Sequence, residues 1–201
     1  MKKQTLATDF DDIFFPLREN IIPFLREKYN LNLKREDFNN YNLQKVFKDK
    51  YFWQTLEKLY SFYKSKYFKQ AKPLKGSIEF LTELSQYFSF PLITSRPIFL
   101  RRETKKFISD FPNGAIKSIH FSRNNFAYAG SRKTKPQICR DIGAKIILED
   151  CLEYALQCAE EGINVILLDA PWNQTMENHP RIKRVQNFSE ARDYALSLVR
   201  I

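Results

Sequence analysis

The sequence predicts an α/β fold in which a parallel sheet carries helices on both faces and a small all-helical unit follows the first strand. Two observations predict the sheet. Short apolar runs alternate with helical patterns of about ten residues, and runs such as Ile146–Leu148 and Val165–Leu168 are continuously apolar, as in strands buried on both faces. A third observation predicts the helical unit: residues 16–70 contain no glycine but hold 13 of the 30 aromatic residues.

The first strand is predicted at Thr5–Thr8, and the helical unit after it is predicted to contain helices at 17–30, near 34–37 and at 51–69. Asn20 is a candidate cap of the first helix, because Pro23 lacks an amide hydrogen and is best tolerated in a first turn. The longest helix is predicted from apolar residues at helical spacing, which are Phe52, Leu56, Leu59, Tyr63 and Tyr67.

The rest of the chain alternates between the two kinds of element. The predicted order is a helix at 77–88, a strand at 90–94, a helix at 101–110, a strand at 116–122, a helix at 135–142, a strand at 145–148, a helix at 152–161, strands at 164–168 and 182–186, and a last helix ending at Val199. Gly162 fits the end of one helix, and Ser189 the start of the last. The predicted domains are a core of residues 1–15 and 71–201 and a helical insert of residues 16–70.

Composition limits the class of protein. The chain has 201 residues, 43% of them hydrophobic and 28% charged, which excludes a disordered or collagen-like protein. A formal charge of +10 predicts attraction to phosphorylated or nucleic-acid partners. Three cysteines without a CxxC motif favour a reducing compartment. Because no apolar run is long enough for a membrane span and the N-terminus does not resemble a signal peptide, we expect a cytoplasmic protein without a membrane partner.

Acidic and hydroxyl side chains follow several of the predicted strands. Ligands of open α/β sheets bind at the carboxyl ends of the strands, so these side chains are expected to meet at one edge. They are Asp9, Asp11, Thr94, Ser95, Ser122, Glu149, Asp150 and Asp169.

Each group of these residues has a functional and a purely structural interpretation. Asp9, Asp11 and Asp12 repel one another unless a cation such as Mg²⁺ neutralises them, but aspartates in a loop also cap backbone amides. The pair at 149–150 either completes a metal site or caps the next helix. Lys135 is a candidate phosphate ligand, with Lys133 as its competitor.

A hydroxyl group after the strand at 90–94 is a further candidate phosphate ligand. Thr94 is the first choice and Ser95 the second, although either residue also suits an ordinary turn.

In this order and placement, Asp9-Phe10-Asp11, Thr94, Lys135 and Glu149-Asp150 resemble the four motifs of the haloacid dehalogenase (HAD) superfamily of phosphohydrolases. The resemblance implies a Rossmann-like core with a helical cap at 16–70. It is nearest to the 5'(3')-deoxyribonucleotidase branch, on the segments Lys135–Cys139 and Leu168–Asn173. Because dehalogenases of the superfamily lack the second aspartate, Asp11 favours phosphoryl transfer over carbon–halogen cleavage.

The resemblance also implies a role for each residue. Asp9 would be the nucleophile that forms an aspartyl-phosphate, and Asp11 the general acid and base with its carbonyl on the metal. Thr94, with Ser95, and Lys135 would hold phosphate oxygens. Asp150 would bind Mg²⁺ directly and Glu149 through water, so the implied metal set is Asp9, Asp11, Glu149 and Asp150, and the implied cofactor is Mg²⁺.

The resemblance implies a phosphomonoester substrate, a nucleoside or deoxynucleoside monophosphate. Phe14, Phe15 and Arg96 are the candidate substrate contacts, and the aromatic residues of the insert are candidates for stacking on a base. Arg123 is interpreted as a surface residue, His120 as a core histidine, Trp172 as a packing anchor and Asn173 as a turn residue. The alternatives are a phosphatase for nucleic-acid ends or another small phosphomonoester, and a non-catalytic nucleic-acid-binding protein; a homodimer is also possible.

Overall fold

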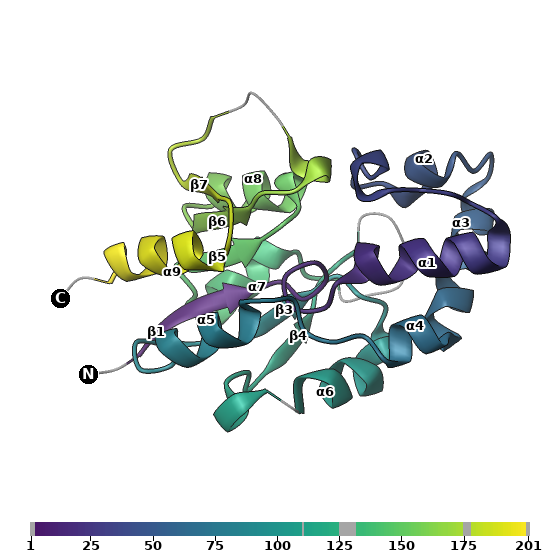
Figure 1. The fold of residues 1–201 in the computed structure, drawn as a ribbon. Helices are drawn as coiled ribbons and strands as arrows, with labels where there is room; N and C mark the ends of the chain where they lie inside the picture. The colour runs from purple at the N-terminus through teal and green to yellow at the C-terminus, as the bar shows by residue number, and fades with distance from the viewer. Residues whose placement is uncertain (1–2, 110, 125–131, 175–177, 200–201) are drawn as a thin grey trace.

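The computed structural model describes residues 3–109, 111–124, 132–174 and 178–199. Within these residues one parallel sheet has the strand order β4-β3-β1-β5-β6-β7, and β2 pairs with the beginning of β1. The strands are β1 (Gln4–Thr8), β2 (Phe88–Ser89), β3 (Leu92–Thr94), β4 (Ile119–Phe121), β5 (Ile146–Glu149), β6 (Asn164–Leu168) and β7 (Ile182–Val185). The predicted α/β fold with a parallel, Rossmann-like sheet is therefore confirmed (Figure 1).

Helices cover both faces of the sheet. They are α5 (Ser77–Leu84), α6 (Arg101–Ser109), α7 (Lys135–Asp141), α8 (Leu152–Glu160) and α9 (Phe188–Ser197). Because successive strand residues point to opposite faces, Leu6 joins the apolar cluster that includes α5 and α9, whereas Ala7 joins the cluster that includes α7 and α8. This double coverage explains why the strand sequences are apolar at consecutive positions.

The helical insert lies beyond the carboxyl end of β1 (Figure 1). It contains α1 (Leu17–Tyr29), the 3₁₀ turn η1 (Arg35–Asp37), α2 (Leu43–Phe47), α3 (Phe52–Lys64) and α4 (Lys66–Lys69). Its core is aromatic: the ring centroids of Phe24 and Phe62 are 5.5 Å apart, and those of Phe68 and Phe15 are 5.0 Å apart. The second contact joins the insert to the loop after β1, so both parts of the chain share one apolar cluster.

The start of α1 differs from the prediction. The helix begins at Leu17, so Pro23 lies inside it and Asn20 is not its cap. The Asn20 side chain instead donates to the carbonyl of Pro16 at 2.7 Å. A residue outside the helix performs the capping, because Asp12 Oδ1 accepts from the amide of Arg18 at 3.0 Å.

Further boundaries also differ from the prediction. The helix expected at 51–69 is interrupted at Ser65, whose hydroxyl accepts from the amide of Phe68 and starts α4. The strand expected at 90–94 is shortened to β3, which begins after Pro91, a residue without an amide hydrogen for a sheet. The helix expected at 77–88 ends at Leu84, and its last predicted residue, Phe88, begins β2 instead. Asn187, rather than Ser189, caps α9 by accepting from the amide of Glu190 at 3.0 Å.

Two more elements of the insert depart from the expectation. The segment near 34–37 is only the short turn η1, and α2 has no counterpart in the predicted helices. Among the described residues, the helices are too short or too polar to cross a membrane.

Candidate active site

The segment after β1 is a tight loop that places two aspartates at the carboxyl end of this central strand. The amide of Asp9 donates to the carbonyl of Leu148 at 2.9 Å, which continues the pairing of β1 with β5. The amide of Asp12 then donates to the carbonyl of Phe15 at 2.7 Å and closes the loop. Asp12 has a φ of 57°, a left-handed conformation that aspartate tolerates better than most residues other than glycine. Asp9 is buried, whereas Asp11 is partly exposed.

Three buried carboxyl groups gather where β1 and β5 end. One oxygen each of Asp9, Glu149 and Asp150 lies within 4.8 Å of the others. Lys135, the first residue of α7, has its Nζ 3.0 Å from Asp9 Oδ1 and forms a buried ion pair with Glu149 Oε1. Glu149 Oε2 accepts from the amides of Asp150 and Cys151 at 2.9 and 3.2 Å. Glu149 thus pairs with Lys135 through one oxygen and fixes the backbone after β5 through the other.

The electrostatics of this cluster show a surplus of negative charge. Burial, and then the nearby Glu149 and Asp11, raise the pKa of Asp9 to about 7, although Lys135 acts in the opposite direction. Burial and the charge of Glu149 raise the pKa of Asp150 well above its ordinary value. Burial opposes the charge of Lys135, but Asp9 and Glu149 raise its pKa well above the ordinary value. Another cation would therefore stabilise the ionised carboxylates.

The residues fit a divalent cation. Asp150 Oδ1 is buried and has no hydrogen-bond partner among the described residues. Asp9 Oδ1 faces Lys135 Nζ at 3.0 Å as an ion pair, but without the geometry of a hydrogen bond. Carboxylate oxygens with unused lone pairs are the ligands that Mg²⁺ prefers, and leaving them buried without a partner is costly.

Three residues that the sequence did not mark as site residues surround Asp150. Arg18 of α1 forms a buried ion pair with Asp12, and its Nη1 lies 3.6 Å from Asp150 Oδ2. Trp172 Nε1 donates to Asp150 Oδ2 at 2.7 Å, and Asn173 Nδ2 donates to the carbonyl of Asp150 at 2.8 Å. The sequence marks Arg18 with no motif, because it follows the apolar run that ends at Leu17 and begins a polar stretch.

The loop after β3 brings Thr94, Ser95 and Arg96 to the same edge of the sheet. Thr94 is buried, and its hydroxyl accepts from the amide of Arg96 at 3.2 Å. Asn124 Nδ2 donates to the carbonyl of Ser95 at 2.7 Å. The Arg96 guanidinium forms an ion pair with Asp11, with Nη2 2.6 Å from Oδ1. The loops that follow two neighbouring strands are thus joined at Asp11.

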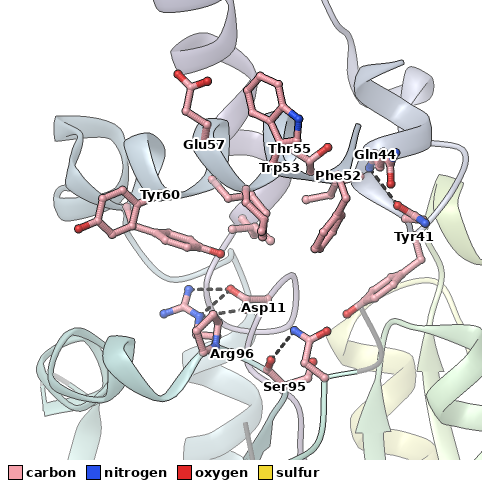
Figure 2. Close-up of a pocket in the computed structure, with 18 of the residues that line it drawn as sticks. Asp11, Tyr41, Gln44, Phe52, Trp53, Thr55, Glu57, Tyr60, Ser95 and Arg96 are labelled. Atoms are coloured by element: carbon pink, nitrogen blue, oxygen red, sulfur yellow. Dashed lines mark hydrogen bonds and ion pairs between the residues drawn. The ribbon is translucent and has the colours of Figure 1, made fainter. Parts of the chain in front are cut away.

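A cavity of about 760 Å³ lies between this edge of the sheet and the helical insert. Figure 2 shows Asp11, Arg96 and Ser95 on its core side, with the ring of Phe52 from α3 pointing towards them from the insert. Its aromatic lining residues are Tyr41, Phe52, Trp53, Tyr60, Tyr63 and Phe99. The cavity therefore combines an apolar, aromatic wall with a charged floor.

Two predicted substrate residues lie elsewhere. Phe14 and Phe15 are fully buried and belong to the apolar core, where Phe15 contacts Phe68 and Phe107, and neither lines the cavity. The physical reason is that the loop after β1 folds back on itself, with the amides of Phe14 and Phe15 donating to the carbonyl of Phe10, and Phe14 then packs against Phe111.

The structure places the two candidate lysines in different surroundings. Lys133 is exposed before the helix and pairs with Asp141 at 2.6 Å. Lys135 occupies the first turn of the helix and is buried against Asp9.

The remaining candidates are peripheral. Arg123 is exposed, and Asp169 pairs with Arg184 at 2.9 Å. His120 is only partly buried, and its Nε2 lies 3.1 Å from the hydroxyl of Ser118, so it is not the core histidine that the sequence suggested.

This fold is shared with hydrolases of known structure. The haloacid dehalogenase-like hydrolase SP0104 from Streptococcus pneumoniae superposes with a TM-score of 0.70 at 15% identity, covering 96% of this chain and 98% of that one. A predicted phosphatase from Clostridium acetobutylicum has a TM-score of 0.66 at 15% identity, over 98% and 100% of the two chains. The chain therefore has the fold of the HAD-like hydrolases, as its motifs indicated.

The family is established by sequence. The model of the 5' nucleotidase, deoxy (pyrimidine), cytosolic type C family matches residues 3–199, and the chain belongs to this family. It is also 26% identical over 174 residues to a protein of Halalkalibacterium halodurans named "Putative nucleotidase BH1399", covering 85% of this chain and 82% of that one. The protein is thus a HAD-type phosphohydrolase of the nucleotidase group, and the predicted resemblance is confirmed.

Proposed function

We propose that the protein is a Mg²⁺-dependent phosphatase of nucleoside or deoxynucleoside monophosphates that acts through an aspartyl-phosphate on Asp9. One observation carries the proposal. Asp9 lies buried between Lys135 and Asp150 at the end of the central strand, and Asp11, two residues later, lines the cavity under the insert. The loop after β1 therefore carries both a nucleophile and a proton-transfer group, and the proposed cation site lies beside it.

The first step is attack of an Asp9 oxygen on phosphorus, which forms a new P–O bond and breaks the bond to the leaving oxygen. Asp11 donates a proton to that leaving oxygen. Lys135, together with the hydroxyls of Thr94 and Ser95, holds the remaining phosphate oxygens. In the second step water attacks the aspartyl-phosphate, Asp11 accepts its proton, and inorganic phosphate leaves with Asp9 regenerated.

Asp9 and Asp150 would hold Mg²⁺, with the carbonyl of Asp11 and with Glu149 through water. The cation supplies charge neutralisation for the transferring phosphoryl group. The solved HAD-hydrolase YfnB from Bacillus subtilis is described as bound to magnesium, and it shares the fold with a TM-score of 0.57 at 14% identity. Lys135 and Arg18 contribute the fixed positive charge of this region.

The cavity supports a nucleoside as the leaving group. Its aromatic wall offers stacking surfaces for a base, each worth roughly 1–3 kcal/mol, and its volume of about 760 Å³ is within the range of small-molecule sites. The family's description names a deoxy, pyrimidine and cytosolic nucleotidase, which supports deoxynucleotide substrates and a cytoplasmic location for this chain.

The test is phosphate release from 5'- and 3'-mononucleotides, sugar phosphates and a 5'-phosphorylated oligonucleotide, each with Mg²⁺ and with a chelator. We expect release from mononucleotides that requires Mg²⁺ and is abolished in Asp9→Asn. Faster phosphate release from the oligonucleotide than from mononucleotides, with a rate that falls steeply on adding salt, would show that the substrate is a nucleic-acid end rather than a mononucleotide. If a folded protein that binds Mg²⁺ releases no phosphate from any substrate, the catalytic proposal is wrong.

A further inference from the structure

Among the residues that the structure describes, the Asp150 carboxylate is held through one of its two oxygens. Oδ2 accepts the indole N–H of Trp172 at 2.7 Å and lies 3.6 Å from Arg18 Nη1. Oδ1 is buried and has no hydrogen-bond partner among the described residues. The backbone is fixed as well, because Asn173 Nδ2 donates to the carbonyl of Asp150 at 2.8 Å. The carboxylate therefore has a defined orientation in which one oxygen remains available.

Arg18 is itself held firmly. Its guanidinium carbon lies 3.9 Å from the centre of the Trp172 ring and 5.1 Å from that of Tyr41. It pairs with Asp12, whose other oxygen accepts the amide of Arg18 at 3.0 Å. The Arg18 side chain is only 3% exposed. With its rotamer restricted on several sides, the guanidinium is a fixed neighbour of Asp150 rather than a mobile surface charge.

These contacts come from different parts of the chain. Arg18 belongs to α1 in the insert, Trp172 belongs to the turn η4 (Pro171–Asn173) after β6, and Asp150 follows β5. Asp12 and Asp150 face one arginine, while Asp9 and Glu149 face one lysine, so two cations serve four carboxylates and negative charge remains in excess. The insert therefore contributes directly to the acidic cluster of the core.

We propose that Arg18 and Trp172 are positioning residues that fix Asp150 so that its Oδ1 is presented to the divalent cation. The inference rests on the metal site of the proposed function, and it adds residues that act through Asp150 without touching the substrate. Partners of metal ligands restrict ligand rotation, and their loss typically weakens metal binding by about 10–100-fold. We expect this loss of Mg²⁺ affinity in variants that remove either contact.

The chain offers a direct spectroscopic test because it has two tryptophans. Trp53→Phe removes an exposed indole, 61% accessible, and leaves Trp172 as the single tryptophan. Since the Trp172 N–H is bonded to Asp150, we expect Mg²⁺ titration of the substrate-free Trp53→Phe protein to change its emission. The dissociation constant from that titration is the reference value.

Arg18→Gln in the Trp53→Phe background is expected to raise the Mg²⁺ dissociation constant about 10–100-fold. Arg35→Gln is the matched control, because its guanidinium also lies over the Trp172 ring, at 5.5 Å, but pairs with Glu19 on the surface. Arg18→Gln leaves Asp12 buried without its cation, so Trp172→Phe provides a second variant that keeps an aromatic ring and loses only the donor. Its Mg²⁺ affinity is measured by calorimetry.

The outcomes separate this inference from the proposed function. Weaker Mg²⁺ binding in Arg18→Gln and Trp172→Phe, with the Arg35→Gln value unchanged and activity recovered at excess Mg²⁺, supports positioning. Unchanged Mg²⁺ affinity in a folded Arg18→Gln or Trp172→Phe protein overturns it and leaves the phosphatase proposal intact. If the Trp53→Phe parent binds no Mg²⁺, or binds it equally after Asp150→Asn, the metal site of the proposed function is wrong.

Discussion

Arg96 donates to both carboxylate oxygens of Asp11. Its Nε lies 3.0 and 2.8 Å from Oδ1 and Oδ2, and its Nη2 lies 2.6 Å from Oδ1. The guanidinium is buried over the rings of Phe10 and Phe15, each 4.3 Å from its carbon, so its own position is fixed. The proposed proton-transfer group is therefore oriented by a residue that follows a neighbouring strand.

Arg96→Lys should lower the rate of phosphate release while the protein stays folded. Lysine keeps the charge but cannot form the two-point contact that orients Asp11. General acid–base groups contribute about 10²–10⁴-fold, so loss of orientation should lower kcat at least about tenfold. The control is Arg123→Lys at an exposed position shortly after β4, and its kcat should equal that of the wild type. Equal rates for both variants would contradict the assigned role of Arg96.

Stability without metal should fall as the pH rises. Since burial and like charges raise the folded pKa of Asp9 to about 7 from its ordinary 3.8, the folded state binds the proton more tightly than the unfolded state. The contribution of Asp9 is thus fully present below about pH 4 and is lost as the pH rises through about 7. Mg²⁺ competes with this proton, so the affinity of the protein for Mg²⁺ should rise from pH 5.5 to 8.

The measurement is the melting temperature in chelator and in Mg²⁺ across this pH interval, together with Mg²⁺ titrations at both ends. The stabilisation by Mg²⁺ should be larger at pH 8 than at pH 5.5. A stabilisation that does not depend on pH would show that Asp9 is not protonated in the metal-free protein.

Lys135→Met should destabilise the protein and abolish activity. Removing one partner of a buried ion pair leaves Asp9 and Glu149 without their cation, which typically costs about 3–5 kcal/mol. Lys133→Met is the control, because that lysine is 61% exposed and its pair with Asp141 is at the surface. Urea unfolding of both variants checks the difference. If the Lys133 variant loses more activity than the Lys135 variant, the assignment of the phosphate-binding lysine is reversed.

Phe52→Ala should raise the KM for nucleoside monophosphates more than it affects a phosphomonoester with a small alcohol. Phe52 lines the cavity from α3, and loss of one stacking surface costs roughly 1–3 kcal/mol, or about 5–150-fold in KM. Tyr51→Ala is the control, since this neighbour is half exposed and is not among the lining residues. A similar change for both substrates would show that Phe52 shapes the fold rather than the base site.

The core of the site could be predicted because it depends on a repeated local pattern. Asp9 and Asp150 each follow a short strand and Thr94 is the last residue of one, and in a parallel sheet such positions share one edge. Burial of the strands on both faces also follows from their composition. The order of residues along the chain is therefore enough to predict the sheet and the acidic cluster at its edge.

Other features depended on how distant segments pack. Arg18 reaches Asp150 because α1 begins at Leu17 and is capped by Asp12. The capping contact joins Asp12 and Arg18, which are six residues apart, and helical periodicity does not predict a contact at that spacing. Trp172 meets Asp150 through the turn after β6. Phe14 and Phe15 follow Asp9 closely in sequence, yet their rings belong to the apolar core, and α3 supplies aromatic rings to the cavity instead. Sequence patterns specify which strand ends meet at one edge of the sheet. The residues that surround those strand ends depend on tertiary packing, because they come from segments that are far apart in the chain.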